Sequence, residues 1–250
     1  MPKVDELPIT LAELMNNIHL FPLSETWLDS QILDSEIDIS GYRVFRQDRN
    51  RNGGGVAVYA RDDLNVVRRL DLEMSGVDAI WVEIFLPKSR RFLLGTFYRP
   101  PNSSDYHDKE FITKVESILE LASLNSTEVI LMVDFNCDFL AKRTYHQECK
   151  HLKSLFKTFN FTQFIDQPTR VSATSSTCLD LIATNPLARC EAPTAGQRPA
   201  GEGANIDRRL VPYTRDAMRI KSRIEFIYLY TYIYASTVVL MRAALEFWPW

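Results

Sequence analysis

Short apolar runs bounded by polar residues recur along most of the chain. The clearest covers 129–133, Val-Ile-Leu-Met-Val, and leads directly into Asp134. An unbroken apolar run of this length, rich in β-branched residues, is typical of a strand buried on both faces. Similar or alternating patterns predict further strands over 18–23, 41–46, 56–59, 66–70, 79–86, 91–98, 161–165 and 178–183.

Apolar residues at helical spacing predict helices over 3–17, 108–124 and 148–159. The predicted strands mostly follow one another along the chain, so we expect them to pair as hairpins. Many hairpins with few helical connections predict an α+β sandwich of two sheets. Pro22 is a defect in the strand predicted over 18–23, because proline removes a donor from the hydrogen-bond ladder.

Polar residues follow two of the buried runs. Asp134 and Asn136 come after 129–133, and Glu25 comes after 18–23. Side chains two positions apart along a strand share a face, so Asp134 and Asn136 should point the same way, with Phe135 turned into the core. A carboxylate beside a carboxamide can hold a metal or orient a water. The alternative is an Asx turn that only ends the strand.

Two other strands carry candidate chemistry. Tyr98 and Arg99 stand immediately before Pro100 and Pro101, which makes them a pair of donors at a rigid strand end. The alternative there is a packed tyrosine with a surface arginine. Asp180 lies within an apolar run, and a buried aspartate needs a partner.

A polar loop with Arg49 and Arg51 precedes three glycines at 53–55. No Lys-Ser/Thr pair and no helix follow the glycines, so a flexible hairpin turn is favoured over a phosphate-binding P-loop. The two arginines are candidates for contact with a nucleic-acid backbone. Solvated surface charges are the alternative.

Composition limits the class of protein. The 250 residues are 46% hydrophobic and 24% charged, with a formal charge of −3, which predicts a globular protein without a global basic signature for nucleic acid. The cysteines have neither metal-ligand spacing nor a paired framework. We therefore expect reduced thiols in an intracellular protein, nuclear or cytoplasmic, at Cys137, Cys149, Cys178 and Cys190.

Five motifs occur in one order over residues 1–186. They are SETWL at 24–28, GYRVFRQDR with GGGVAVY at 41–59, FYRPP at 97–101, DFNCDF at 134–139 and SSTCLDLIATN at 175–185. Together they resemble the endonuclease/exonuclease/phosphatase superfamily and, more closely, the endonuclease domain of non-LTR retrotransposon polyproteins. The resemblance implies a four-layer α/β sandwich, with two packed, mostly antiparallel sheets and helices outside. It also implies hydrolysis of phosphodiester bonds in DNA with Mg²⁺ or Mn²⁺.

The resemblance also implies a role for each matching residue. Glu25 matches the metal-binding glutamate, and Tyr98 the tyrosine that contacts the scissile phosphate. Asp134 matches the aspartate that orients or deprotonates the attacking water, and Asn136 the asparagine that stabilises the developing charge. Asp180 matches the aspartate that hydrogen-bonds the catalytic histidine. Arg49, Arg51 and Arg99 are the candidates for substrate contact.

The sequence departs from the family pattern at both ends. It lacks the first strand with its terminal asparagine, and no Ser-Asp-His tripeptide follows Asp180. All four histidines precede Asp180, namely His19, His107, His146 and His151. We therefore expect a truncated domain with impaired activity. A non-catalytic or binding-only remnant and a phosphatase of the same superfamily are the alternatives.

Residues 187–250 show no resemblance to the family and carry a net charge of +3, against −6 for 1–186. The small and polar stretch at 192–203 predicts disorder. The apolar stretch at 226–241 is interpreted as translated non-domain sequence. A membrane anchor is less favoured, because a helix of ~24 Å falls short of a ~30 Å hydrocarbon core. An ordinary strand or helix is the remaining alternative.

Overall fold

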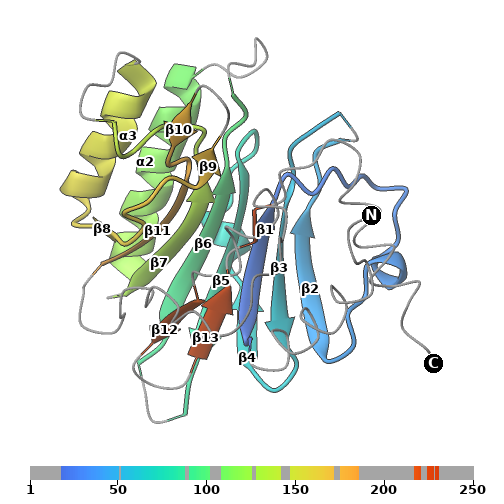
Figure 1. Cartoon of the computed structure of the whole chain (residues 1–250). Coiled ribbons are helices and arrows are strands. Elements are labelled where there is room, and N and C mark those ends of the chain that lie inside the picture. Colours follow the sequence, from blue (N-terminus) through green and yellow to red (C-terminus); the bar gives the residue numbers. More distant parts are fainter. Residues whose placement is uncertain are drawn as a thin grey trace, which may run out of the picture.

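The computed structural model describes residues 18–50, 52–87, 90–101, 108–125, 128–141, 147–171 and 175–185, together with the backbone of 217–220, 224–227 and 229–230. Two six-stranded sheets and two α-helices make up most of its regular structure (Figure 1). The helix predicted over 3–17 lies outside the described residues.

The first sheet, called the β7 sheet, holds the strands from the middle of the chain. Its strand order is β4-β5-β6-β7-β11-β8, and only the β6–β7 pair is parallel. The strands are β4 (Asn65–Arg68), β5 (Asp78–Phe85), β6 (Phe92–Tyr98), β7 (Val129–Asp134), β8 (Thr162–Gln163) and β11 (Asp180–Asn185). The buried run at 129–133 is therefore an inner strand, as its unbroken apolar character predicts.

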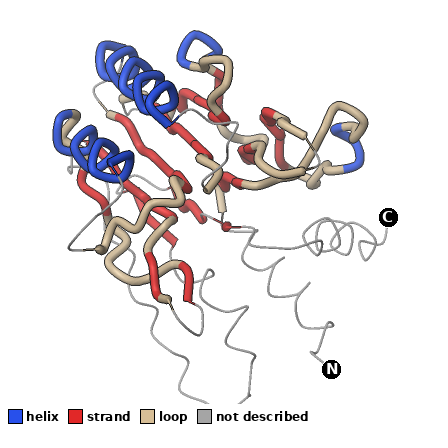
Figure 2. Tube along the Cα trace, turned by 90° about the horizontal axis from the view of Figure 1, so that it is seen from above, coloured by secondary structure: helices blue, strands red, loops and turns tan. Residues whose placement is uncertain are grey.

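Helices α2 (Asp108–Asn125) and α3 (Gln147–Thr158) lie side by side against this sheet (Figures 1 and 2). Helix α2 supplies the crossover that the parallel β6–β7 pair requires. Helix α3 buries Cys149, Leu152, Leu155 and Phe156 on the face that packs inward.

The second sheet, called the β1 sheet, has the order β12-β13-β1-β3-β2, and β14 also pairs with β1. It contains β1 (Leu20–Ser24), β2 (Tyr42–Gln47), β3 (Val56–Arg61), β12 (Ala217–Ile220), β13 (Ile224–Ile227) and β14 (Leu229–Tyr230). Part of 187–250 thus pairs with the predicted domain, through strands parallel to β1. The domain boundary at 186 remains a prediction.

The two sheets share one apolar core. Leu20, Val56 and Val58 from the β1 sheet belong to the same buried cluster as Trp81 and Phe97 from the β7 sheet. The 3-10 turns η1 (Asp34–Glu36) and η2 (Leu70–Leu72) and the small hairpin β9 (Arg170–Val171) with β10 (Ser176–Thr177) complete the regular elements. Two sheets with two helices agree with the predicted α+β class.

Pro22 is accommodated by the register of β1. Arg61 donates its backbone N–H to the carbonyl of His19 at 2.9 Å, so the odd positions of β1 exchange hydrogen bonds with β3. Pro22 lies opposite Val58 at an even position. Its missing donor therefore interrupts no bond to β3, because such a position faces the other edge of the strand.

The expectation of reduced thiols is wrong for two cysteines. Cys137 and Cys149 form a disulfide, with their Cα atoms 5.5 Å apart. The folding back of α3 brings Cys149 against the loop that follows β7, and a spacing of 12 residues in the sequence gives no sign of this contact. Cys178 is a buried free thiol, and Cys190 lies outside the described residues.

In the part of the chain that the structure describes, no helix is long and apolar enough to cross a membrane. The apolar stretch at 226–241 contributes 226–227 and 229–230 to strands, and 231–241 lies outside the described residues.

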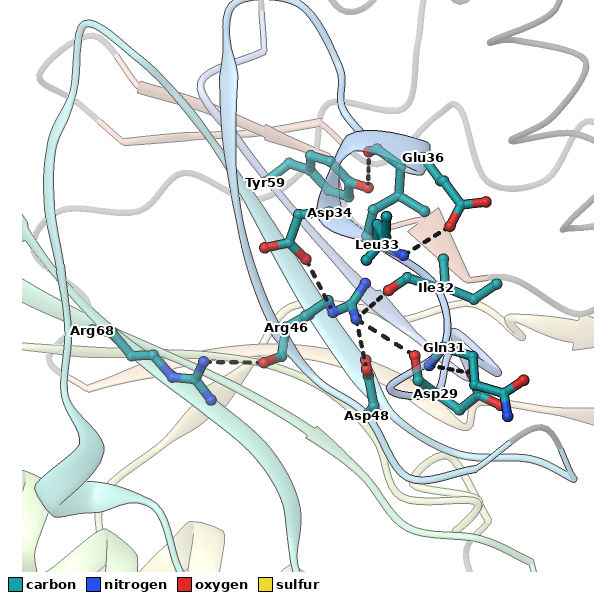
Figure 3. A network of polar contacts seen from close by, with 11 residues as sticks. Asp29, Gln31, Ile32, Leu33, Asp34, Glu36, Arg46, Asp48, Tyr59 and Arg68 are labelled. Atoms are coloured by element: carbon teal, nitrogen blue, oxygen red, sulfur yellow. Dashed lines mark hydrogen bonds and ion pairs between the residues drawn. The ribbon is translucent and has the colours of Figure 1, made fainter.

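Arg46 on β2 binds the loop at 29–34 (Figure 3). This loop follows residues 24–28, here called the Glu25 segment. The Arg46 guanidinium donates to the carbonyl of Ile32 at 2.6 Å and pairs with Asp34 at 3.2 Å and Asp48 at 3.1 Å. The side chain is only 17% exposed. Burial raises the pKa of Asp48, and the Arg46 charge lowers it.

We expect Arg46→Met to lower the free energy of unfolding by about 2–3 kcal/mol, since it leaves a carbonyl and a half-buried carboxylate without their donor. The matched control is Arg61→Met, which removes a pair with the 62% exposed Asp63 and should cost less than about 1 kcal/mol. Urea unfolding of both variants measures the difference. Equal losses would show that the Arg46 network adds nothing to stability beyond that of a surface pair.

Candidate functional site

The register of the β7 sheet places four polar residues in a row. Asp78 lies opposite Tyr98, Tyr98 opposite Asp134, and Asp134 opposite Asp180. Paired residues on adjacent strands present their side chains on the same face. These four residues, here called the polar row, therefore cross the sheet at one end of β5, β6, β7 and β11. All four are buried.

Glu25 joins the polar row from the other sheet. It follows β1 directly, and its carboxylate accepts a hydrogen bond from the Tyr98 hydroxyl. Burial raises the pKa of Glu25, and the Tyr98 bond opposes that shift. Burial and the Glu25 carboxylate both raise the pKa of Tyr98, so the phenol is a neutral donor. The sequence prediction that Glu25 stands at a strand end is confirmed.

Asp134 and Asn136 lie together, as the two-residue spacing predicts. The Asn136 backbone N–H donates to Asp134 Oδ1 at 2.9 Å, and its side-chain Nδ2 lies 3.5 Å from Asp134 Oδ2. The Asx turn is thus present. It also keeps the side chains of Asp134 and Asn136 together at the polar row, so the two alternatives do not exclude each other. Asn136 has φ 48°, a value that asparagine tolerates better than most residues. Phe135 is turned into the core.

Asp180 is a buried carboxylate whose oxygens lack hydrogen-bond donors among the described residues. Its backbone N–H donates to the Thr169 hydroxyl at 3.1 Å. Burial is the main cause that raises the pKa of Asp180 to about 7. Burial, then the Asp180 charge, holds the pKa of Asp134 well above its usual range.

The predicted arginines fall into three different places. Arg49 lies beside the polar row, with Nη1 3.7 Å from Asp78 Oδ2. Arg99 is 4% exposed and donates to the Phe135 carbonyl at 3.1 Å, so it supports the turn after β7 from inside. Arg51 lies outside the described residues.

Two members of the site were missed by sequence reasoning. Asp78 begins β5, and its place became visible only through the register with Tyr98. Arg170 is a half-buried cation on β9 whose charge lowers the pKa of Glu25, Asp134 and Asp180. No local pattern distinguishes either residue: Asp78 is placed by the register of β5 with β6, and Arg170 by the β9–β10 hairpin.

Several carboxylates with raised pKa values converge here, which favours a bound cation. No group of three or more His, Cys, Asp or Glu in the described part of the chain could hold a metal by itself. Mg²⁺ does not require such a group, because it commonly takes one or two carboxylates and fills its other positions with water and phosphate oxygens. The Glu25 carboxylate beside Asp134 fits that preference.

Solved structures share this fold. The endonuclease domain of TRAS1, a telomere-specific non-LTR retrotransposon, is 13% identical, with a TM-score of 0.53 over 72% of this chain and 79% of that domain. The 3'-5' exonuclease NExo from Neisseria meningitidis is 14% identical, with a TM-score of 0.53 over 77% and 91%. The Xenopus laevis APE2 catalytic domain is 16% identical, with a TM-score of 0.51 over 72% and 77%.

No protein-family model matches the sequence, and no curated protein matches it. The structural likenesses show that the chain shares the fold of these three domains. At identities this low, the likenesses establish the fold only, and the chemistry has to be argued from the residues of the site.

Proposed function

We propose that this chain is a metal-dependent phosphodiester hydrolase of the endonuclease type, of retroelement origin and acting on DNA. The observation that carries the proposal is the hydrogen bond between Glu25 and Tyr98, made across the two sheets beside Asp134. It brings a cation-binding carboxylate, a neutral phenol and a water-orienting carboxylate together at one end of a nuclease-type fold. The sequence motifs around these residues support the same function.

Each residue has a role that its environment supports. Glu25 would hold Mg²⁺ or Mn²⁺, which when bound neutralises charge that grows on the phosphate. Tyr98 would give up its bond to Glu25 when the metal binds there, and would then donate its one O–H to a phosphate oxygen. Asp134 orients the attacking water and accepts its proton, and a raised pKa suits a base that works near neutral pH. Asn136 holds Asp134 in place and lies next to the developing charge.

The cations near the site suit a polyanionic substrate. Arg49 and Arg170 lie close enough to affect the ionisation of the polar row or of Glu25. They would contact phosphates on either side of the scissile bond, and Arg51 is a further candidate. Arg99 contributes indirectly by fixing the turn at Asn136, whose Nδ2 donates to the Arg99 carbonyl at 2.8 Å.

A second function, DNA binding without efficient cleavage, is favoured by one observation. The resemblance would place a catalytic histidine at Asp180, and the Asp180 carboxylate has no hydrogen-bond partner among the described residues. General acid–base help is typically worth ~10²–10⁴-fold in rate. We therefore propose that cleavage by this chain is slow.

We expect Mg²⁺ and Mn²⁺ to bind through Glu25, and Glu25→Gln to weaken binding by roughly tenfold or more. Binding to the wild type should tighten as the pH rises from acid towards neutral, because burial raises the pKa of the Glu25 carboxyl and the metal needs its ionised form. Titration calorimetry measures both effects. The control is Glu120→Gln on the exposed face of α2, which should bind as the wild type does. Equal binding by Glu25→Gln and the wild type would remove Glu25 from the metal site.

A further inference from the structure

The proposed chemistry gives no role to Asp78, although this residue begins the polar row. Its side chain is 12% exposed, and Oδ2 accepts the backbone N–H of Gly55 at 3.1 Å. The same oxygen lies 3.7 Å from Arg49 Nη1. Burial raises the pKa of Asp78, while the Gly55 bond and the Arg49 charge both lower it. Asp78 Oδ2 thus contacts both Arg49 and the turn at residues 53–55, here called the glycine turn.

The glycine turn fits closely between Asp78 and the Glu25 segment. Gly54 and Gly55 have φ values of 82° and 81°, which residues with a side chain rarely adopt. A Cβ on Gly54 would come within 2.6 Å of Asp78 Oδ2, and one on Gly55 within 2.7 Å of Thr26 Oγ1. Only glycine at these two positions lets the turn lie against both Asp78 and Thr26.

The carbonyl groups of the glycine turn bind the backbone next to Glu25. The Thr26 N–H donates to the Gly55 carbonyl at 3.3 Å, and the Trp27 N–H donates to the Gly54 carbonyl at 3.0 Å. Glu25 and Trp27 have φ values of 54° and 56°. A non-glycine residue in this region costs free energy and stays there only when its surroundings fix it. The glycine turn provides that fixation.

Arg49 is the second group that Asp78 positions. Its Nη1 lies 3.7 Å from Asp78 Oδ2, so the guanidinium lies at the β5 end of the polar row. Asp78 and Tyr98 are paired residues of β5 and β6. The ion pair with Asp78 therefore helps to hold Arg49 at the edge of the site.

We propose that Asp78 is a positioning residue for Glu25 and Arg49. Its oxygen fixes the glycine turn that holds the Glu25 segment, and its negative charge holds Arg49 beside the polar row. The consequence for substrate rests on the proposed function, whereas the consequence for the backbone does not. Asparagine and alanine at position 78 separate the two roles, because asparagine keeps an acceptor for Gly55 and alanine keeps neither the acceptor nor the charge.

The backbone role is tested by amide hydrogen exchange of segments 24–28 and 53–56. Asp78→Ala should speed exchange of both segments by about tenfold, as expected for loss of a buried hydrogen bond. Asp78→Asn should leave both near the wild-type rate. The control is Asp71→Ala, which removes an exposed partner of Arg69. Faster exchange in 53–56 alone, or equal exchange in the asparagine and alanine variants, would overturn the backbone role.

The role toward Arg49 is tested by a double-mutant cycle on binding of a fluorescein-labelled DNA duplex in Ca²⁺. With Arg49 present, Asp78→Asn should weaken binding by roughly threefold to tenfold, since the guanidinium loses the carboxylate that positions it. In the Arg49→Met background the same change removes only a negative charge near phosphate, so binding should be equal or tighter. Weaker binding in both backgrounds, or tighter binding in both, would overturn this role.

The two tests also separate this inference from the proposed function. If the wild type does not bind the duplex, the proposed function fails, and hydrogen exchange still decides whether Asp78 fixes the Glu25 segment. If the wild type binds the duplex and both tests fail, the proposed function stands without Asp78.

Discussion

Asp180→Asn is expected to raise the melting temperature at pH 8 by roughly 5 °C or more. The wild-type carboxylate is buried without a hydrogen-bond partner among the described residues, beside the Asp134 carboxylate in the register of β7 and β11. An amide of the same size removes the buried charge and fills the same space. Removal of an unpaired buried charge stabilises by about 2–4 kcal/mol, and 1 kcal/mol corresponds to about 2–4 °C in a domain of this size.

The sign of the pH dependence follows from the raised pKa. Burial raises the pKa of Asp180 from 3.8 to about 7, so the folded state holds a proton that the unfolded state has lost. The wild type is therefore most stable below about pH 4, as far as this group is concerned, and loses that stability as the pH rises to about 7. The advantage of Asp180→Asn should be large at pH 8 and small at pH 5.

Thermal unfolding in EDTA at the two pH values measures this effect. Asp166→Asn is the matched control, because Asp166 is exposed, and its melting temperature should follow that of the wild type. A lower melting temperature for Asp180→Asn at pH 8 would mean that the carboxylate is ionised and stabilised by a partner, and would contradict this account of the site.

Asp134→Asn is expected to lower the rate of phosphodiester cleavage by about 10²-fold or more. The amide keeps the size and acceptor oxygen of the side chain, so the turn to Asn136 can persist. It cannot accept a proton from water, and that contribution is typically worth ~10²–10⁴-fold. Cleavage of an end-labelled duplex in Mg²⁺ measures the rate.

The matched control for this substitution is Asp138→Asn. Asp138 lies four residues beyond Asp134, outside the polar row, and accepts the backbone N–H groups of Cys178 and Leu140 at 3.1 Å. An amide oxygen can accept the same bonds, so the cleavage rate should stay within about threefold of the wild type. Equal losses in both variants would attribute the effect to the loop after β7 and not to the water-orienting carboxylate.

The pattern of apolar and polar residues along the chain correctly predicted individual strands and the direction of the side chains on them. The apolar run at 129–133 became β7, and the alternation after it put Phe135 in the core with Asp134 and Asn136 together. The carboxyl ends of β1 and β7 pointed to Glu25 and Asp134, because polar residues at the ends of buried strands collect at a sheet edge.

Features that arise from long-range pairing could not be predicted in this way. Asp78 joins the polar row only through the register of β5 with β6. Cys149 meets Cys137 only after α3 packs on the β7 sheet. Arg99 follows a strand as a surface donor would, yet its side chain turns inward to the Phe135 carbonyl. In each case the deciding partner is distant in sequence or is a backbone group with no sequence signal.

The central claim is that Glu25, Tyr98 and Asp134 form a metal-dependent site for phosphodiester cleavage. The most direct measurement is the nicking of supercoiled plasmid by the wild type and Asp134→Asn, purified side by side, with Mg²⁺ and with EDTA. We expect slow nicking by the wild type in Mg²⁺, none in EDTA and none by Asp134→Asn. Nicking that persists in EDTA or in Asp134→Asn, or a wild type that yields no nicked product in Mg²⁺, would contradict the claim.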